Sequence, residues 1–307
     1  MKKVILLFII TLVITSCKND VKNEENINKK LNVVTTTTMI TDLVKNIGGN
    51  LINVKGLMGA GVDPHLYKAS EGDVTKLVNA DVIFYNGLHL EGKLVEVFEK
   101  MEASNKTPIA LAKEINKRHL IGSEYFASNY DPHVWFNIDF FEKFAEKVTL
   151  VLSEKDPTNA ETYRTNEKRY LTELEKLRED VESAIEALEP EKRILVTAHD
   201  AFNYFGKSYG FEVVGLQGLS TATEAGVKDV QKLAAFIIEK NIKAIFIESS
   251  VPKRTIEALQ KAVNSKGHKV EIGGTLYSDA LGSEGSNEGT YVGMYRYNIK
   301  TIVSALQ

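Results

Sequence analysis

Residues 156–193 read DPTNAETYRTNEKRYLTELEKLREDVESAIEALEPEKR, and this stretch decides how the rest of the chain is organised. Pro157 stands near its start and Pro190 near its end, with no glycine or proline between them. Apolar side chains recur at spacings of three, four or seven residues, which predicts one helix of about 30 residues, about 45 Å long, with a single buried stripe. The stripe consists of Tyr163, Tyr170, Leu174, Leu177, Val181, Ile185 and Leu188. A coiled coil with a partner helix is the alternative, but the stripe is short and leads into further strands and helices.

On both sides of this helix, segments typical of strands alternate with segments typical of helices. Strands are expected over residues 31–38, 52–58, 81–87, 107–112, 193–199, 211–218, 242–250 and 268–276, and helices over 39–48, 71–80, 91–101, 138–156, 200–210, 227–241, 253–267 and 290–307. Such alternation predicts parallel sheets covered by helices on both faces. We therefore expect an α/β protein with two lobes, residues 32–155 and 191–307, joined by a single long backbone helix over residues 156–190.

The N-terminus has a different composition. MKK precedes VILLFIITLVIT, an apolar run shorter than the roughly 20 residues that span a bilayer, which is typical of a signal peptide. The run ends at ITSC, residues 14–17, which resembles a bacterial lipobox and contains the only cysteine of the chain. We expect residues 1–16 to be removed and Cys17 to carry lipid, the alternative being a free thiol at the end of a membrane anchor. Residues 17–31 are rich in Asn, Lys and Glu, which predicts a polar, disordered tether.

The composition also limits the partners. The formal net charge is −3, and the folded part contains no block of Lys and Arg. We therefore expect no binding to nucleic acid. A single cysteine allows no intramolecular disulfide. The sequence has no glycine-rich phosphate motif with Lys and Ser or Thr, so nothing indicates a nucleotide site.

The tripeptide Asp-Pro-His occurs twice, in GVDPHLYKAS over residues 61–70 and in NYDPHVWFN over residues 129–137. Proline fixes its own φ and biases Asp63 and Asp131 toward extended geometry, so each tripeptide is a stiff loop that orients its histidine. One such histidine alone is more often a surface turn residue. Two identical settings predict that His65 and His133 are ligands.

The second half of the chain offers two more candidate ligands. In RILVTAHDAF, residues 193–202, His199 follows a buried strand and precedes a helix, at the edge where α/β proteins bind their ligands. In GTLYSDALGSEG, residues 274–285, Asp279 follows the last strand. Three imidazoles and one carboxylate form a set of ligands suited to a divalent transition metal.

The remaining histidines lack this setting. His89 follows a strand and is the reserve ligand, whereas His119 and His268 are predicted to be surface residues. Glu248 ends a strand and either orients a ligand or caps the next helix.

Other polar residues near the candidate ligands have two interpretations each. Asp63, Asp131 and Asp200 flank ligands and either orient them or shape turns. We expect Trp135 to pack near the site without touching the metal. The run STATEAG, residues 220–226, is either a loop that lines the cleft or the start of a helix.

The ordered set of motifs resembles the zinc and manganese receptors of bacterial ABC importers, which are solute-binding lipoproteins. TAHDAFNYFGKSYGFEVVGLQGLSTATEAG (197–226), IFIESSVPKRTIEAL (245–259) and GGTLYSDALG (273–282) are similar to second-lobe segments of that family, and the resemblance covers nearly the whole mature chain. It implies that the four candidate ligands, His65, His133, His199 and Asp279, bind the metal in the cleft between two lobes. It also implies a backbone helix that restricts hinge motion.

The resemblance further implies the role of the protein. We expect a monomeric, extracytoplasmic receptor, lipid-anchored through Cys17 to a bacterial membrane at the periplasm or the cell surface, that delivers a metal to an ABC permease. A metal-dependent hydrolase, with Asp279 or Glu248 as the base, is one alternative, but the chain lacks an HExxH pattern. A surface adhesion lipoprotein is the other, and no feature of the sequence supports it. We expect no enzymatic activity.

The transported metal remains open between Zn²⁺ and Mn²⁺. Three histidines with one carboxylate suit Zn²⁺, and the general order of affinities places Zn²⁺ above Mn²⁺. In the family, a glutamate in the place of His199 goes with manganese, so the histidine favours zinc. Against zinc, dedicated zinc receptors often carry a long loop rich in histidine and acidic residues, whereas residues 66–132 contain only His89 and His119. We expect zinc, with manganese as the alternative.

Overall fold

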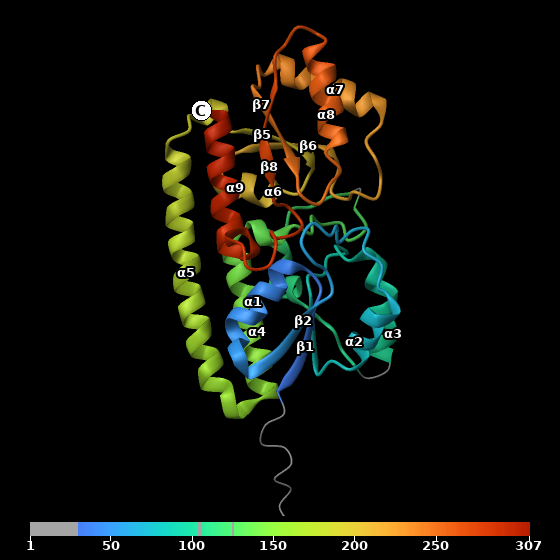
Figure 1. Cartoon of the computed structure of the whole chain (residues 1–307), viewed down its shortest axis with the longest axis vertical. Coiled ribbons are helices and arrows are strands. Elements are labelled where there is room, and N and C mark those ends of the chain that lie inside the picture. Colours follow the sequence, from blue (N-terminus) through green and yellow to red (C-terminus); the bar gives the residue numbers. More distant parts are fainter. Residues whose placement is uncertain (1–29, 104–105, 125) are drawn as a thin grey trace, which may run out of the picture. The chain divides into compact units, whose positions relative to one another are not determined.

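The computed structural model describes residues 30–103, 106–124 and 126–307 (Figure 1). The predicted signal peptide, Cys17 and residues 18–29 of the predicted tether lie outside the described residues. None of the helices in the described ranges combines the length and the apolar content needed to cross a membrane.

The first half of the chain builds a parallel sheet with the strand order β2-β1-β3-β4. Its strands are β1 (Leu31–Thr35), β2 (Ile52–Gly56), β3 (Val82–Tyr85) and β4 (Ile109–Ala110). Val33 and Val34 of β1 point to opposite faces of the sheet, because successive Cβ atoms alternate along a strand. Val33 joins the large core around the long helix, and Val34 joins a smaller core. Both faces of this sheet are therefore covered, as an α/β fold requires.

Four helices accompany this sheet, namely α1 (Thr38–Gly48), α2 (Glu71–Val78), α3 (Val95–Ala103) and α4 (Ile138–Lys155). All four strands of this sheet are shorter than predicted, and the structure shows what ends two of them. The strand predicted over 31–38 ends at Thr35 because the side chain of Thr37 caps α1 by accepting the Ile40 N–H. The strand predicted over 107–112 is reduced to two residues because Leu111–Glu114 turn into a 3₁₀ helix.

The second half contains two pairs of parallel strands. β5 (Ile194–His199) pairs with β6 (Glu212–Gln217), and β7 (Ala244–Glu248) pairs with β8 (Glu271–Leu276). β5 and β7 are neighbours in space. The helices of this half are α6 (Asn203–Tyr209), α7 (Val227–Glu239), α8 (Arg254–Asn264) and α9 (Tyr291–Leu306). This arrangement confirms the predicted order of strands and helices after residue 190.

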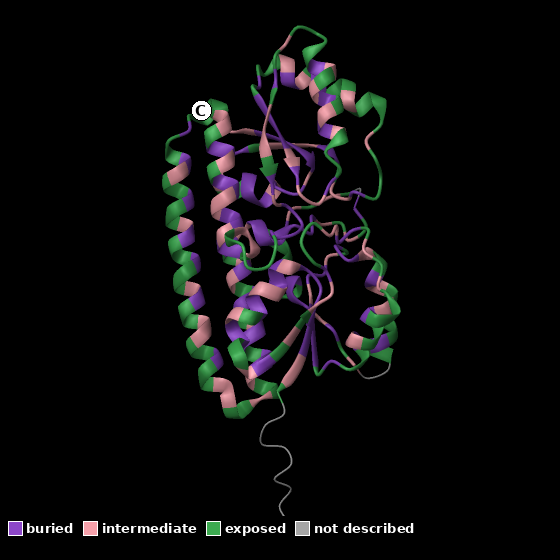
Figure 2. Ribbon diagram, in the orientation of Figure 1, coloured by how far each residue is buried: buried purple, intermediate pink, exposed green. Residues whose placement is uncertain are grey.

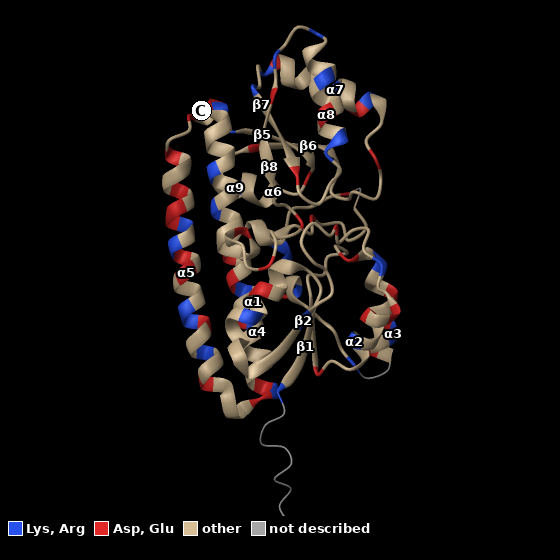
Figure 3. Ribbon diagram, in the orientation of Figure 1, with Lys and Arg blue, Asp and Glu red and all other residues tan. Residues whose placement is uncertain are grey.

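The long helix α5 (Ala160–Glu186) has 27 residues and is about 40 Å long at about 1.5 Å per residue. All seven side chains of its predicted apolar stripe are buried. They face α1 and α4 of the first half and α9 of the second half, so the chain itself covers the stripe without a partner helix (Figure 2). Basic and acidic residues are interspersed along α5 (Figure 3), and most of them are exposed. One helix thus braces both sheet regions, as predicted.

Candidate metal centre

Four side chains from separate parts of the chain meet at one point. One ligand atom from each of His65, His133, His199 and Asp279 lies within 4.8 Å of the corresponding atoms of the other three. His199 is the last residue of β5 and Asp279 follows β8, whereas His65 and His133 stand on loops of the first half. The ends of parallel strands thus supply two of the four groups, as expected for an open α/β sheet.

The distances among the four groups suit one metal ion. Nε2 of His65 lies 3.2 Å from Nε2 of His133 and 3.8 Å from Oδ2 of Asp279. Oδ2 of Asp279 lies 3.2 Å from Nε2 of His199, and Oδ1 lies 3.6 Å from Nε2 of His133. Metal–ligand bonds of about 2.0–2.1 Å in a tetrahedron place the ligands about 3.3 Å apart. The arrangement therefore needs only small adjustments to close around an ion.

The centre of the cluster also contains polar atoms without partners. Nε2 of His199 and both carboxylate oxygens of Asp279 are buried, and no described residue completes a hydrogen bond to them. Among the described residues, the only positive charge that faces the buried Asp279 carboxylate comes from the three imidazoles, with Nε2 of His199 at 3.2 Å. Such a buried anion is costly unless positive charge compensates it. A cation between these atoms would satisfy all of them, so the donor set fits a metal.

Neighbouring charges shift the pKa values of these groups. Burial raises the pKa of Asp279, but His199, His133 and His65 outweigh it and hold the pKa below its usual value. Burial lowers the pKa of His65 to about 3. Burial also lowers the pKa of His199, but the charges of Glu248 and Asp279 outweigh it, and the pKa lies well above its usual value. In the absence of metal, Asp279 is thus an anion and His199 a cation.

The two Asp-Pro-His loops use their aspartates in the same way. Oδ1 of Asp63 accepts the backbone N–H of His65 at 2.8 Å, and Oδ1 of Asp131 accepts that of His133 at 2.9 Å. An aspartate that bonds the N–H two residues later makes an Asx turn. Together with the rigid proline, this turn fixes the backbone position of each histidine. This gives a physical reason for the repeated tripeptide.

Carboxylates also lie behind the rings of two histidines. Nδ1 of His133 is 2.7 Å from Oδ1 of Asp131, and Nδ1 of His199 is 2.7 Å from Oε2 of Glu248. The contact at His199 has the geometry of an ion pair rather than of a straight hydrogen bond. Both contacts turn Nε2 toward the centre of the cluster. Glu248 therefore contacts the candidate ligand His199. It does not cap the next helix, since α8 begins only at Arg254.

Trp135 links the two halves behind the cluster. Its ring lies edge-on to that of His133, with centroids 5.3 Å apart, and its indole N–H donates to the carbonyl of Ser278 at 3.1 Å. The hydroxyl of Tyr291 in α9 donates to the Trp135 carbonyl at 2.7 Å. Trp135 therefore holds the segment of Asp279 against the segment of His133.

The other predicted residues lie outside the cluster. His89 and His119 are exposed, and half-buried His268 bonds through Nε2 to the carbonyl of Ile242 at 2.7 Å. Asp200 ties the segment after β5 to the neighbouring strand β6, since its Oδ1 accepts the N–H of Gly215 at 2.6 Å. His89, the reserve ligand, is therefore not among the four groups that meet.

Two buried residues near the cluster were missed from the sequence. The side-chain amide of Asn86 donates to the carbonyl of Pro132 at 3.0 Å, next to His133. Glu91 is buried, accepts the Asn86 N–H at 2.8 Å and accepts the Thr36 hydroxyl at 2.7 Å. Burial raises the pKa of Glu91. In the sequence, Asn86 falls near the end of the strand predicted over residues 81–87 and Glu91 at the start of the helix predicted over residues 91–101, and neither position indicates a link to His133.

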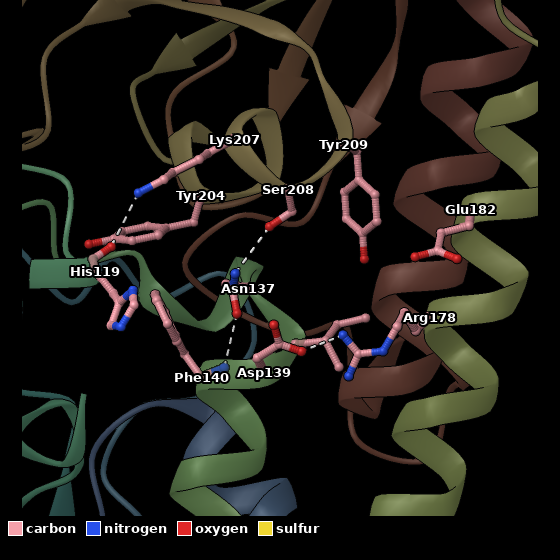
Figure 4. Close-up of a pocket in the computed structure, with 11 residues that line it drawn as sticks. His119, Asn137, Asp139, Phe140, Arg178, Glu182, Tyr204, Lys207, Ser208 and Tyr209 are labelled. Carbon is pink, nitrogen blue, oxygen red and sulfur yellow. Dashed lines mark hydrogen bonds and ion pairs between the residues drawn. The ribbon is translucent and has the colours of Figure 1, made fainter. Parts of the chain in front are cut away.

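A separate cavity of about 400 Å³ lies where α4, α5 and α6 meet, and it is lined by none of the four groups (Figure 4). Arg178 on its wall pairs with Asp139 and, at 2.7 Å, with Glu142. Across the cavity, the Asn137 amide donates to the hydroxyl of Ser208 at 3.1 Å. The Arg178 guanidinium is thus already paired with two carboxylates. We therefore interpret this cavity as a junction between helices rather than as the candidate site.

The fold and the cluster together define a class of protein. It is an α/β protein with parallel strands in both halves, one long helix that packs against both halves, and a buried cluster of side chains suited to a metal ion. Residues 33–305 match the family described as zinc-uptake complex component A periplasmic, and the chain belongs to this family.

Two curated relatives match along nearly their whole length. The chain is 46% identical over 297 residues to the manganese-binding lipoprotein MntA of Bacillus subtilis, covering 97% of this chain and 96% of the relative. It is 49% identical over 274 residues to the zinc-binding protein TroA of Treponema pallidum, covering 89% and 88%. The first relative is named for manganese binding and the second for zinc binding.

Solved structures agree with the fold. The periplasmic zinc-binding protein TroA of Treponema pallidum matches with a TM-score of 0.88 at 49% identity, over 91% of this chain and 99% of that chain. A manganese-bound periplasmic metal-binding protein of Candidatus Liberibacter asiaticus matches with a TM-score of 0.76 at 29% identity, over 91% and 100%. The arrangement of parallel strands around one long helix is thus shared with solved metal-binding proteins.

Proposed function

We propose that the chain is an extracytoplasmic receptor that captures one divalent transition metal ion and delivers it to the permease of an ABC importer. The ligands in this proposal are His65, His133, His199 and Asp279. The observation that carries it is the convergence of these four buried groups, whose central atoms, Nε2 of His199 and both oxygens of Asp279, complete no hydrogen bond with a described residue. Membership of the zinc-uptake family and the names of the relatives support the same role.

We propose zinc as the preferred ion and manganese as a second cargo. Three imidazoles and one carboxylate oxygen at near-tetrahedral spacing suit Zn²⁺. Asp279, however, turns its two oxygens toward different histidines, with Oδ1 near His133 and Oδ2 near His199. A carboxylate that binds through both oxygens raises the coordination number, which suits Mn²⁺ better than Zn²⁺.

A receptor accounts for the site better than a hydrolase. A hydrolase needs a base beside a metal-bound water. Both oxygens of Glu248 already contact His199, and Asp279 is itself a proposed ligand. Neither residue is therefore free to act as the base, and we propose that the chain is not an enzyme. No contact among the described residues favours an adhesion role.

The membrane attachment is part of the same proposal. We propose that residues 1–16 are cleaved, that Cys17 is lipidated, and that residues 17–31 tether a monomeric receptor with lobes 32–155 and 191–307 around the helix 156–190. The MntA relative is named a lipoprotein, which supports this view. Replacement of Cys17 by Ala should prevent incorporation of labelled fatty acid and release the receptor from the membrane fraction.

Metal analysis tests the proposed function. The mature protein, purified without added metal and stripped with a chelator, should bind one equivalent of Zn²⁺ in competition with a chromophoric chelator. Mn²⁺ should compete for the same equivalent with lower affinity. Absence of binding, or a stoichiometry that persists after replacement of Asp279 by Ala, would refute the proposal.

A further inference from the structure

The three histidines of the cluster are not held equally. Carboxylates stand behind Nδ1 of His133 and of His199, each at 2.7 Å. Among the described residues, none forms a hydrogen bond with Nδ1 of His65, whose ring contacts the cluster only through Nε2. A carboxylate behind an imidazole fixes its tautomer and its orientation. His65 is therefore the least restrained of the three rings.

His65 is also the group nearest to solvent. Its exposed fraction is 5%, whereas that of each of the other three groups is at most 1%. It stands on the loop between β2 and α2, and the next residue, Leu66, is 49% exposed. Movement of this loop would open the cluster without disturbing a strand or a helix.

One hydrogen bond ties this loop to the second half of the chain. The hydroxyl of Thr221 donates to Oδ2 of Asp63 at 2.5 Å, while Oδ1 of the same carboxylate accepts the His65 N–H at 2.8 Å. Thr221 is buried in the segment between β6 and α7, which is the STATEAG run whose role the sequence left open. Thr221 therefore acts on the backbone of His65 through Asp63.

A cavity lies beside Phe126, which contacts His65. A cavity of about 410 Å³ is lined by Phe126 and by the carboxylate-bearing residues Asp200, Glu224 and Asp229. The ring of Phe126 meets the imidazole of His65 edge-on, with centroids 6.4 Å apart. Glu224 pairs with Arg254 at 3.2 Å, and the carboxylates of Asp200 and Asp229 each accept a backbone N–H. Phe126 thus lies against His65 and also lines this cavity.

We infer that His65 is the first ligand to release the metal, and that the Thr221 hydroxyl, acting through Asp63, holds His65 in place until then. This inference rests on the metal capture proposed above. Thr221 is a positioning residue, since it contacts none of the four ligand atoms. Its loss therefore affects the rate at which metal leaves more than the rate at which it binds.

The rate of zinc dissociation tests this role. The zinc-loaded mature protein is mixed with excess chelator in a stopped-flow instrument, and the association rate is measured separately. Thr221→Val removes the hydroxyl and keeps the shape of the side chain, and we expect zinc to dissociate about tenfold faster, the effect of losing one hydrogen bond to a charged group. The association rate should stay within about twofold, because association depends mainly on encounter.

Two further variants distinguish the effect of the Thr221 hydroxyl from a general effect of substitutions in the same loop. Thr221→Ser keeps the hydroxyl and should dissociate at the wild-type rate. Thr223→Val is the matched control, because the Thr223 side chain is exposed and makes no hydrogen bond with another described residue. Dissociation from Thr221→Val at the wild-type rate, or equally fast dissociation from Thr223→Val, would overturn the inference. If Thr221→Val does not fold, Thr221→Ala replaces it with the same expectation.

A second measurement does not depend on metal. In the metal-free protein, hydrogen exchange over residues 61–67 should be faster in Thr221→Val than in the wild type, because the Asx turn at Asp63 loses its support. Unchanged exchange would overturn the positioning role even if no metal bound. Failure of the wild-type protein to bind zinc would instead refute the proposed function, so the two failures are distinguishable.

Discussion

Glu248 contacts His199 at two points, since Oε1 accepts the backbone N–H of His199 at 2.8 Å and Oε2 lies 2.7 Å from its ring Nδ1. The two residues end the neighbouring strands β7 and β5. A rigid pair of strands therefore sets the direction of the His199 ring, and Nε2 faces Asp279. The orientation of the His199 ring is thus fixed before a metal ion binds.

Removal of the charge on Glu248 should weaken metal binding. Glu248→Gln keeps an oxygen for the His199 N–H but loses the anion behind Nδ1, so we expect zinc affinity to fall about 10–100-fold. Chelator competition measures the change. Glu239→Gln, at the exposed end of α7, is the matched control and should bind like the wild type. Wild-type affinity in Glu248→Gln would show that the ring is held by its packing alone.

Zinc binding should release about one proton near neutral pH. The pKa of His199 lies well above its usual value, so its imidazole is protonated at neutral pH and must lose this proton before Nε2 can bind metal. The pKa of His65 is about 3, so that ring is already neutral. Affinity should therefore rise about tenfold per pH unit between about pH 5.5 and 7.5. Calorimetry in buffers of different ionisation enthalpy counts the protons, and a count of zero would contradict the charged state of His199.

Histidines inside and outside the cluster should respond differently to truncation. His65→Ala or His199→Ala removes a proposed ligand and should lower zinc affinity by more than about 100-fold, since even loss of an outer partner costs about 10–100-fold. His268→Ala should leave the affinity unchanged, because His268 contacts the Ile242 carbonyl and not the cluster. Isothermal titration of the three variants makes the comparison. An equal loss in His268→Ala would show that the ligands are assigned wrongly.

Tryptophan fluorescence should report occupation of the site directly. Trp135 is the only tryptophan of the chain, and its ring lies 5.3 Å from that of His133. Its indole N–H also bonds to the carbonyl beside Asp279, so closure around an ion changes its surroundings. We expect the emission to change and to saturate at one equivalent of zinc. The change should be absent in Asp279→Ala, and a signal that persists there would indicate binding elsewhere.

Much of the fold is predictable because its signals are local. The apolar stripe predicted for the long helix repeats with the period of a helix, and its seven side chains are buried as expected, six of them in α5 and Leu188 just after it. The ends of the elements are less predictable, because they depend on single contacts. Thr37, for example, ends a strand by capping α1 although its β-branched neighbours favour extended geometry.

The candidate site likewise has a part that the sequence predicts and a part that it does not predict. His65 and His133 are visible in the sequence because the same tripeptide occurs twice, and His199 and Asp279 because each follows a strand. The contacts that support them are not visible, because they join residues far apart along the chain. Nothing near Thr221 indicates that its hydroxyl bonds Asp63, and nothing near Asn86 indicates that its amide bonds the carbonyl of Pro132.

Crystallography of the zinc-loaded protein, with anomalous differences recorded at the zinc absorption edge, tests the central claim most directly. We expect a single strong peak bonded to Nε2 of His65, His133 and His199 and to one or both oxygens of Asp279, at about 2.0–2.2 Å. A main peak elsewhere, or one that any of these four side chains fails to reach, would contradict it.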